Sequence, residues 1–100
     1  QEVTPGRANV WASRAGGGVT LSTHVDTVPP FLAPRLDGDW LYGRGACDAK
    51  GIAAAMLVAA EELVQGGEDR VDLLFVVGEE KGSDGARMAN RLPATSRYLI

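Results

Sequence analysis

A chain of 100 residues is long enough for one domain and too short for two. Its 45% of hydrophobic residues and 23% of charged residues are typical of a globular protein, which excludes a disordered chain. A net charge of −3 without a basic run argues against a nucleic-acid partner, and the single cysteine excludes an internal disulfide and favours a reducing, cytoplasmic location.

The first third of the chain predicts two short strands and a loop. Residues 9–12 predict a strand, and the glycine-rich residues 15–18 predict the tip of a hairpin that leads into a second strand at 19–24. Three prolines between residues 27 and 34 are incompatible with regular structure, so we expect a loop there.

The middle of the chain predicts a turn and a long helix. Asp37-Gly38-Asp39 is a turn signal, and residues 40–42 are expected to be extended. A helix is predicted from residue 50 or 51 to about residue 65, because alanine, leucine and methionine favour it and Gly66-Gly67 supplies a stop. Its first turns are apolar on every side, so we expect burial in a layered core. The longest apolar run, residues 52–60, is too short to span a membrane.

The last third continues the alternation of strands and helices. Residues 71–77 have the β-branched and aromatic composition of a strand inside a parallel sheet. A short helix is predicted over residues 83–91, capped by Ser83 or Asp84 and ended by Pro93, and residues 97–100 resemble the start of another strand. The order of these elements predicts an α/β fold.

Three acidic motifs accompany the predicted strands. The only histidine, His24, precedes Asp26 by two residues, so both side chains lie on one face if the strand continues. A carboxylate in that position can orient an imidazole, as it does beside many metal-binding histidines. Asp48 and the pair Glu79-Glu80 follow later. We expect all three motifs after the carboxyl ends of strands, where open α/β sheets bind their ligands.

These side chains belong to the ligand types that zinc accepts, imidazole nitrogen and carboxylate oxygen. Glu79 and Glu80 point in different directions on an extended backbone, so one can bind metal while the other faces a water molecule. A metal lowers the pKa of a bound water to roughly 7, where a carboxylate can take its proton. The small residues around Asp48 allow close backbone approach, which suits a position between two ions.

Each motif by itself also has a simpler interpretation. A His-x-Asp pair is most often a histidine with a polar neighbour, Glu79-Glu80 could form a solvated turn, and Cys47 is expected to serve packing. Two rival hypotheses follow. One is a non-catalytic α/β module that uses its carboxylates for structural or regulatory metal binding or for docking. The other is a phosphate-binding protein using the loop at 43–51, although that loop lacks the glycines and lysine of known phosphate loops.

Taken in this order, residues 22–30, 42–51 and 77–85 closely resemble the three N-terminal signatures of the co-catalytic zinc exopeptidases and deacylases. That family includes acetylornithine deacetylase, succinyl-diaminopimelate desuccinylase, carboxypeptidase G and aminoacylase, and the first two are the most similar. The resemblance covers the chain from about Gly6 onward. It implies a three-layer α/β fold of the zinc-exopeptidase type, a mixed sheet flanked by helices, present here as a fragment. It also implies hydrolysis of the amide bond of an N-acyl amino acid or small peptide.

The resemblance implies a role for each candidate residue. His24 would bind one zinc ion, Asp26 would orient His24 as part of the catalytic site, and Asp48 would bridge both ions. Glu79 would be the general acid and base, and Glu80 a ligand of the second ion. The implied cofactor is a pair of Zn²⁺ ions, with Co²⁺ or Mn²⁺ as alternatives. A cis peptide bond is expected directly after Asp48.

The sequence departs from the family pattern in two ways. Ile52 stands where a second glycine is usual, which is a conservative change. The family also completes its site with a later acidic ligand and a distal histidine, and it carries a lid domain, whereas this sequence has one histidine. We therefore expect residues 1–100 to form part of a catalytic domain that is inactive alone, without the lid domain or the C-terminal part of the catalytic domain. Uncovered sheet edges would favour self-association.

Overall fold

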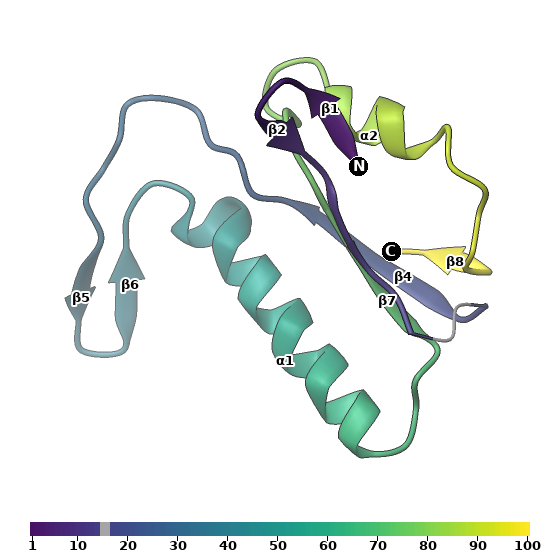
Figure 1. The fold of residues 1–100 in the computed structure, drawn as a ribbon. Helices are drawn as coiled ribbons and strands as arrows, with labels where there is room; N and C mark the ends of the chain where they lie inside the picture. The colour runs from purple at the N-terminus through teal and green to yellow at the C-terminus, as the bar shows by residue number, and fades with distance from the viewer. Residues whose placement is uncertain (15–16) are drawn as a thin grey trace.

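The structure is a computed structural model that describes residues 1–14 and 17–100 (Figure 1). Part of the predicted hairpin tip, residues 15 and 16, lies outside the described residues. The elements in chain order are β1 (Glu2–Thr4), β2 (Arg7–Ala8), β3 (Val10–Ala12), β4 (Val19–His24), β5 (Arg35–Asp37), β6 (Trp40–Tyr42), the helical turn η1 (Ala46–Gly51), α1 (Ile52–Gln65), β7 (Val71–Val76), α2 (Asp84–Ala89) and β8 (Tyr98–Leu99).

A four-stranded mixed sheet with the order β3-β7-β4-β8 forms the centre of the fold (Figure 1). β4 runs parallel to both β7 and β8, while β3 runs antiparallel to β7. The pairing of β4 with β7 runs from Val19 opposite Val71 to His24 opposite Val76. The two strands therefore end level with each other at one edge of the sheet. This arrangement confirms the predicted α/β class and the mixed sheet.

The predicted hairpin between residues 9–12 and 19–24 is wrong in its pairing. β7 lies between β3 and β4 and pairs with both of them. Five of the six residues of β7 are buried, so this strand is apolar enough to require a partner on each side and cover on both faces. That burial outweighs the short sequence separation that favours a hairpin.

Alternate residues of β7 face opposite sides of the sheet, as the two-residue period of a strand requires. Val71 and Leu73 pack with Ala60 of α1 in the principal hydrophobic core. Asp72, between them, points to the other face, where its carboxylate accepts a hydrogen bond from Ser96 Oγ at 2.9 Å. α1 thus covers one face, and the segment after α2 approaches the other.

The helix α1 confirms the predicted segment but not the predicted burial. It begins at Ile52 and ends at Gln65, and only Ala53 and Ala60 are buried. Leu57 and Val58 are 52% and 55% exposed. A helix laid on one face of a sheet buries a single stripe of its surface, so its remaining apolar residues face outward unless a further layer covers them. No helix in the described part of the chain has the length and apolar character needed to cross a membrane.

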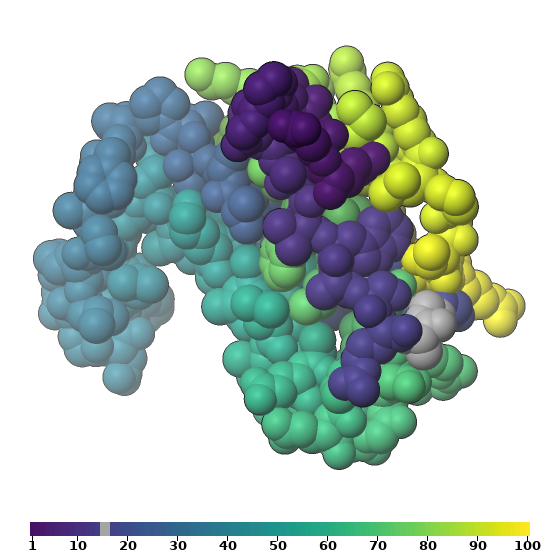
Figure 2. Space-filling model, viewed as in Figure 1, coloured from purple at the N-terminus to yellow at the C-terminus, as the bar shows by residue number. Residues whose placement is uncertain are grey.

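The segment between β4 and α1 contains the predicted loop and a small hairpin. Residues 27–34 are irregular, as expected, and Asp37-Gly38-Asp39 joins β5 to β6, although β5 itself was not predicted. This two-stranded sheet is separate from the central one. Figure 2 shows that it projects from the body of the molecule.

The C-terminal third follows the prediction with shorter elements. Ser83 occupies the N-cap of α2, but its side chain forms no capping hydrogen bond, and its φ of 55° is left-handed. α2 ends at Ala89, two residues before the predicted limit. β8 confirms the strand expected within residues 97–100. In Figures 1 and 2 the N-terminal segment with β1 lies beside α2, and Gln1 Nε2 donates a hydrogen bond to the carbonyl of Met88 at 2.9 Å.

Candidate metal and catalytic site

Two of the three acidic motifs meet because β4 and β7 end at the same edge of the sheet. His24 is the last residue of β4 and lies opposite Val76. Asp26 follows one strand, and Glu79 follows the other within a few residues. The Nε2 atom of His24 lies 3.8 Å from Oε2 of Glu79. Parallel pairing therefore joins residues that are 55 positions apart in the chain.

The third motif reaches the site by a different route from the one predicted. Asp48 does not follow a strand of the central sheet, because β6 belongs to the separate hairpin. It lies in η1, where it and Ala49 have non-helical backbone angles, and α1 starts directly afterwards. The Asp48–Ala49 peptide bond is cis, as the resemblance implied. Since α1 packs on the sheet, its amino end brings Asp48 to His24.

Gly45 allows this approach of the backbone. Its φ of 81° is left-handed, and a Cβ atom there would lie 2.7 Å from both Thr27 Cγ2 and Lys50 Nζ. Only glycine adopts that conformation without strain and leaves room for both neighbours. The predicted role of small residues around Asp48 is therefore supported at this position.

His24 lies at the centre of the cluster. Its Nε2 atom is 2.8 Å from Oδ1 of Asp48, and its Nδ1 atom is 3.1 Å from the backbone carbonyl oxygen of Asp26. Because a carbonyl oxygen only accepts, Nδ1 carries the hydrogen and donates it. With a hydrogen on Nδ1, Nε2 donates to the Asp48 carboxylate when the imidazole is protonated, and in the neutral imidazole it carries the lone pair instead. That is the nitrogen a metal ion would use.

The surroundings of His24 raise its pKa. Burial alone would lower it, since the side chain is only 10% exposed, but the hydrogen bonds with Asp48 and with the Asp26 carbonyl and the charges of Asp48 and Glu79 outweigh burial. The protonated imidazole is thereby stabilised in the absence of metal. Asp48 and Glu79 are more open, with side chains 74% and 48% exposed, so solvent reaches the site from their side.

Asp26 has a different contact from the one expected. Its carboxylate is 3.7 Å from Nδ1 of His24, beyond hydrogen-bond distance, and the backbone carbonyl holds the ring instead. The two carboxylate oxygens accept the backbone N–H groups of Glu79 at 3.2 Å and Glu80 at 3.3 Å. Burial alone would raise the pKa of Asp26, but these amide hydrogen bonds outweigh it and lower the pKa. Asp26 therefore ties the histidine motif to the glutamate pair.

The contact that joins Glu80 to the site is made by its backbone N–H, which donates to Asp26. Within the described residues, its carboxylate forms no hydrogen bond or ion pair. Among residues 1–14 and 17–100, no three histidine, cysteine, aspartate or glutamate side chains are grouped closely enough to hold a metal ion. The donor types of His24 and Asp48 fit zinc, and their facing atoms provide two ligands. A zinc ion held there would need at least one further ligand.

Asn9 was missed by the sequence reasoning. It is 3% exposed, and its side chain contacts the segment that carries the two glutamates. An asparagine before a short apolar strand looks the same in sequence as one in an ordinary turn. Only the long-range contacts reveal the difference.

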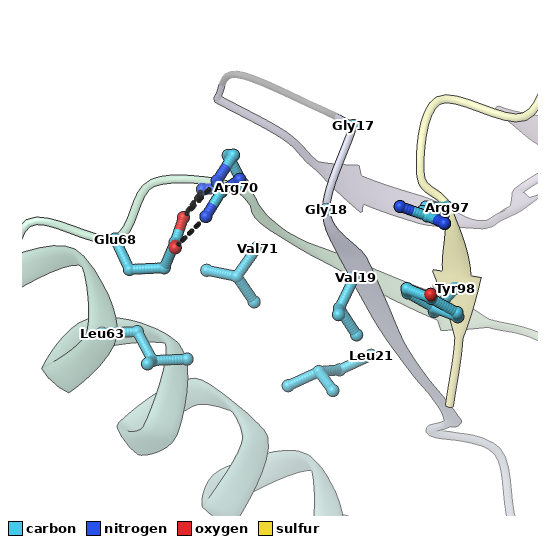
Figure 3. A pocket seen from close by; sticks show the side chains of 10 residues that line it. All are labelled: Gly17, Gly18, Val19, Leu21, Leu63, Glu68, Arg70, Val71, Arg97 and Tyr98. Carbon is cyan, nitrogen blue, oxygen red and sulfur yellow. Dashed lines mark hydrogen bonds and ion pairs between the residues drawn. The ribbon is translucent and has the colours of Figure 1, made fainter.

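A pocket of about 430 Å³ lies at the opposite end of the sheet (Figure 3). Val19 and Val71, the first residues of β4 and β7, contribute to its walls, together with Arg97 and Tyr98. Its lining is mainly apolar and includes none of the candidate metal or catalytic residues. The candidate residues lie instead where the parallel strands β4 and β7 have their carboxyl ends.

The chain is similar to known proteins over most of its length. Residues 20–96 match the profile of Peptidase family M20/M25/M40. A peptidase M20 domain-containing protein of Schizosaccharomyces pombe is 45% identical over 101 residues, which cover 94% of this chain and 25% of that protein. A [LysW]-lysine/[LysW]-ornithine hydrolase of Sulfurisphaera tokodaii is 45% identical over 84 residues, covering 84% of this chain and 24% of that protein.

A probable carboxypeptidase of Aspergillus clavatus is 36% identical in an alignment of 115 positions, gaps included. The alignment covers 98% of this chain and 28% of that protein. The chain spans about a quarter of the length of these curated relatives. The resemblance based on the three motifs is confirmed at the level of the family. Because the matching profile covers most of its residues, this chain belongs to Peptidase family M20/M25/M40.

Proposed function

We propose that this chain is part of a metal-dependent hydrolase that cleaves the amide bond of N-acyl amino acids or small peptides. The observation that carries the proposal is the convergence on His24, whose Nε2 atom lies 2.8 Å from Asp48 and 3.8 Å from Glu79. The names of the relatives, a lysine or ornithine hydrolase and probable carboxypeptidases, support hydrolysis next to an amino acid.

His24 and Asp48 would hold the metal, and Glu80 would be a further ligand. Zn²⁺ is the proposed ion, in a pair bridged by Asp48, and Co²⁺ or Mn²⁺ would suit the same donors. When bound, the metal would supply Lewis-acid polarisation of the scissile carbonyl and of the attacking water. The Nδ1–H group of His24 donates to the Asp26 carbonyl, which keeps Nε2 available as a ligand.

Glu79 would act as general base and then as general acid. Its carboxylate is half exposed and lies on the solvent side of His24, where a substrate and a water molecule can approach. Oε2 of Glu79 would take a proton from the water and then deliver it to the leaving amine. Asp26 would fix the backbone of Glu79, so that the carboxylate stays near the metal ligands.

We further propose that residues 1–100 correspond to the N-terminal part of a three-layer catalytic domain and are inactive alone. Two findings support this. The chain spans about a quarter of the length of its relatives, and the described residues contain no group of three metal donors. Catalytic zinc sites commonly use three protein ligands, so the proposed site requires further residues. A lid domain is proposed on the resemblance alone.

The test uses a polypeptide extended to the length of the relatives. We expect zinc-dependent hydrolysis of N-acetylornithine or a related N-acyl amino acid. Glu79→Gln should lower kcat by about 100-fold or more, because general acid–base catalysis contributes about 10²–10⁴-fold, while metal content stays unchanged. His24→Ala should lose bound metal. Glu62→Gln, an exposed change on α1, is the matched control and should behave like the wild type.

Two results would redirect the proposal. Undiminished turnover by Glu79→Gln would show that another group is the base. Stoichiometric zinc binding without hydrolysis of any N-acyl amino acid or dipeptide would favour the rival hypothesis, a non-catalytic metal-binding module.

A further inference from the structure

The side chain of Asn9 connects two segments that flank the glutamate pair. It lies between β2 and β3 and is 3% exposed. Its Oδ1 atom accepts a hydrogen bond from the backbone N–H of Val77 at 3.2 Å, and its Nδ2 atom donates to the carbonyl of Gly85 at 2.8 Å. One carboxamide group therefore contacts both the end of β7 and the first turn of α2.

The residues between these two contacts form a closed loop. The N–H of Gly85 donates to the carbonyl of Val77 at 2.9 Å, so the ends of the loop are also joined directly. A Cβ atom at Gly85 would collide with that carbonyl and would lie 2.5 Å from Oδ1 of Asn9. Glycine is thus required for the close approach. Glu79 and Glu80 lie within the loop whose base Asn9 holds.

A second residue, Asp26, holds the same loop at another point. The Asp26 carboxylate accepts the N–H groups of Glu79 and Glu80, as described above. Asn9 acts at the base of the loop and Asp26 acts at the glutamates themselves. Without Asn9, the Val77 amide and the Gly85 carbonyl would lose a partner at a place where Gly85 is buried, which is costly. The base of the loop would then shift to find new partners.

We infer that Asn9 is a positioning residue that places Glu79 and Glu80 relative to His24 by fixing the base of their loop. The inference rests on the proposed function of the two glutamates. In the described part of the chain, the side-chain hydrogen bonds of Asn9 reach Gln1, Val77 and Gly85 and none of the candidate metal ligands, so its effect passes through the backbone. Outer residues that orient metal ligands typically change metal affinity or activity by about 10–100-fold when they are replaced.

The test compares Asn9→Ala with Thr20→Val in the 100-residue chain. Thr20 is a suitable control because it lies on β4 of the same sheet and is 4% exposed. Its Oγ1 atom donates to Ser96 Oγ at 2.6 Å, away from the glutamate loop. Amide hydrogen exchange measured by NMR without metal should accelerate by about tenfold or more at Glu79 and Glu80 in Asn9→Ala. Zinc affinity, measured by calorimetry on the polypeptide extended to the length of the relatives, should fall by about tenfold. Thr20→Val should change neither quantity.

The two measurements separate this inference from the proposed function. If the extended wild-type polypeptide binds no zinc but Asn9→Ala selectively accelerates exchange of the glutamate amides, the positioning role stands and the proposed metal-dependent function fails. Unchanged exchange in Asn9→Ala, or an equal acceleration in Thr20→Val, would overturn the inference.

A conservative variant provides an independent check if Asn9→Ala does not fold. Asn9→Asp keeps an oxygen acceptor for the Val77 amide but cannot donate to the Gly85 carbonyl. Amide hydrogen exchange at Glu79 and Glu80 should then be faster than in the wild type. It should be slower than in any folded variant that lacks both the hydrogen bond to Val77 and the one to Gly85. Wild-type exchange rates in Asn9→Asp would contradict the role.

Discussion

At the scale of single residues, the sequence identifies the candidate side chains, but only the structure shows which atoms they contact. The sequence proposed five site residues: His24, Asp26, Asp48, Glu79 and Glu80. The structure brings the first four together, and Glu80 contacts Asp26 through its backbone N–H. The sequence could not show that the Asp26 carbonyl holds the imidazole while the Asp26 carboxylate holds the glutamate loop. Such assignments depend on angstrom-scale geometry between remote segments.

An ion pair outside the site gives a prediction for pH dependence. The Glu68 carboxylate accepts hydrogen bonds from the Arg70 side chain at 2.7 Å and 3.0 Å and from the Arg70 backbone amide, which lower the pKa of Glu68 to about 2 (Figure 3). Because the folded-state pKa lies below the unfolded value, its contribution to stability is present above the ordinary glutamate pKa. It is lost as pH falls through about 2.

We expect Arg70→Gln to move the pKa of Glu68 back toward the ordinary glutamate value of about 4.3, followed by ¹³C NMR of the carboxylate. Arg91→Gln, which removes another exposed arginine, should leave the Glu68 titration unchanged. The Arg70 and Glu68 side chains are 65% and 41% exposed, and solvent weakens an ion pair of this kind, so the temperature of unfolding at neutral pH should change little. A wild-type Glu68 that titrates at the ordinary value would contradict the prediction.

At the scale of elements, local sequence patterns predicted where helices and strands begin and end better than they predicted which strands pair. The helix expected from residue 50 or 51 to about 65 is α1 at Ile52–Gln65, and the strand expected at 71–77 is β7 at Val71–Val76. Side-chain periodicity and turn residues are local signals, so these bounds follow from the sequence. The insertion of β7 between β3 and β4 does not, because it depends on which surfaces bury each other.

The contact between β7 and α1 should carry much of the stability. Leu73 is 8% exposed and packs in the core with Val71 and Ala60. Leu73→Ala should reduce the free energy of unfolding by about 2–5 kcal/mol, because it removes buried methyl groups and leaves a cavity. Leu36→Ala, at a leucine of β5 that is 75% exposed, should change it by less than about 0.5 kcal/mol. Urea unfolding would measure both, and equal losses would argue against this core.

At the scale of the whole molecule, many apolar side chains remain on the surface. Leu57 and Val58 of α1 are about half exposed, and Leu99 of the outer strand β8 is 66% exposed. Within the described residues, β3 and β8 are the outer strands of the central sheet, each with one pairing partner. Outer strands with exposed apolar residues can pair with another chain. We therefore propose that the 100-residue chain self-associates.

Sedimentation velocity over a range of concentrations would test the self-association. The average mass should rise with concentration, and Leu99→Lys should shift the molecule toward the monomer, because a lysine on an outer strand opposes pairing. Gln65→Lys adds the same charge at the end of α1 and should not have this effect. A wild-type chain that stays monomeric at every concentration would refute the proposal.

The sequence by itself determined the α/β class, the principal helix and strands and the family, and it proposed His24, Asp26, Asp48, Glu79 and Glu80 as site residues. These depend on residue types, periodicity and motif order, which are properties of neighbours along the chain. The tertiary structure decided the order of the strands and the position of Asp48 in η1 directly before α1, which places it beside His24. It also decided the contacts of Asp26 and Asn9 with the glutamate loop. The physical reason is that these hydrogen bonds join residues 24 to 76 positions apart, and no local pattern specifies which of them will meet.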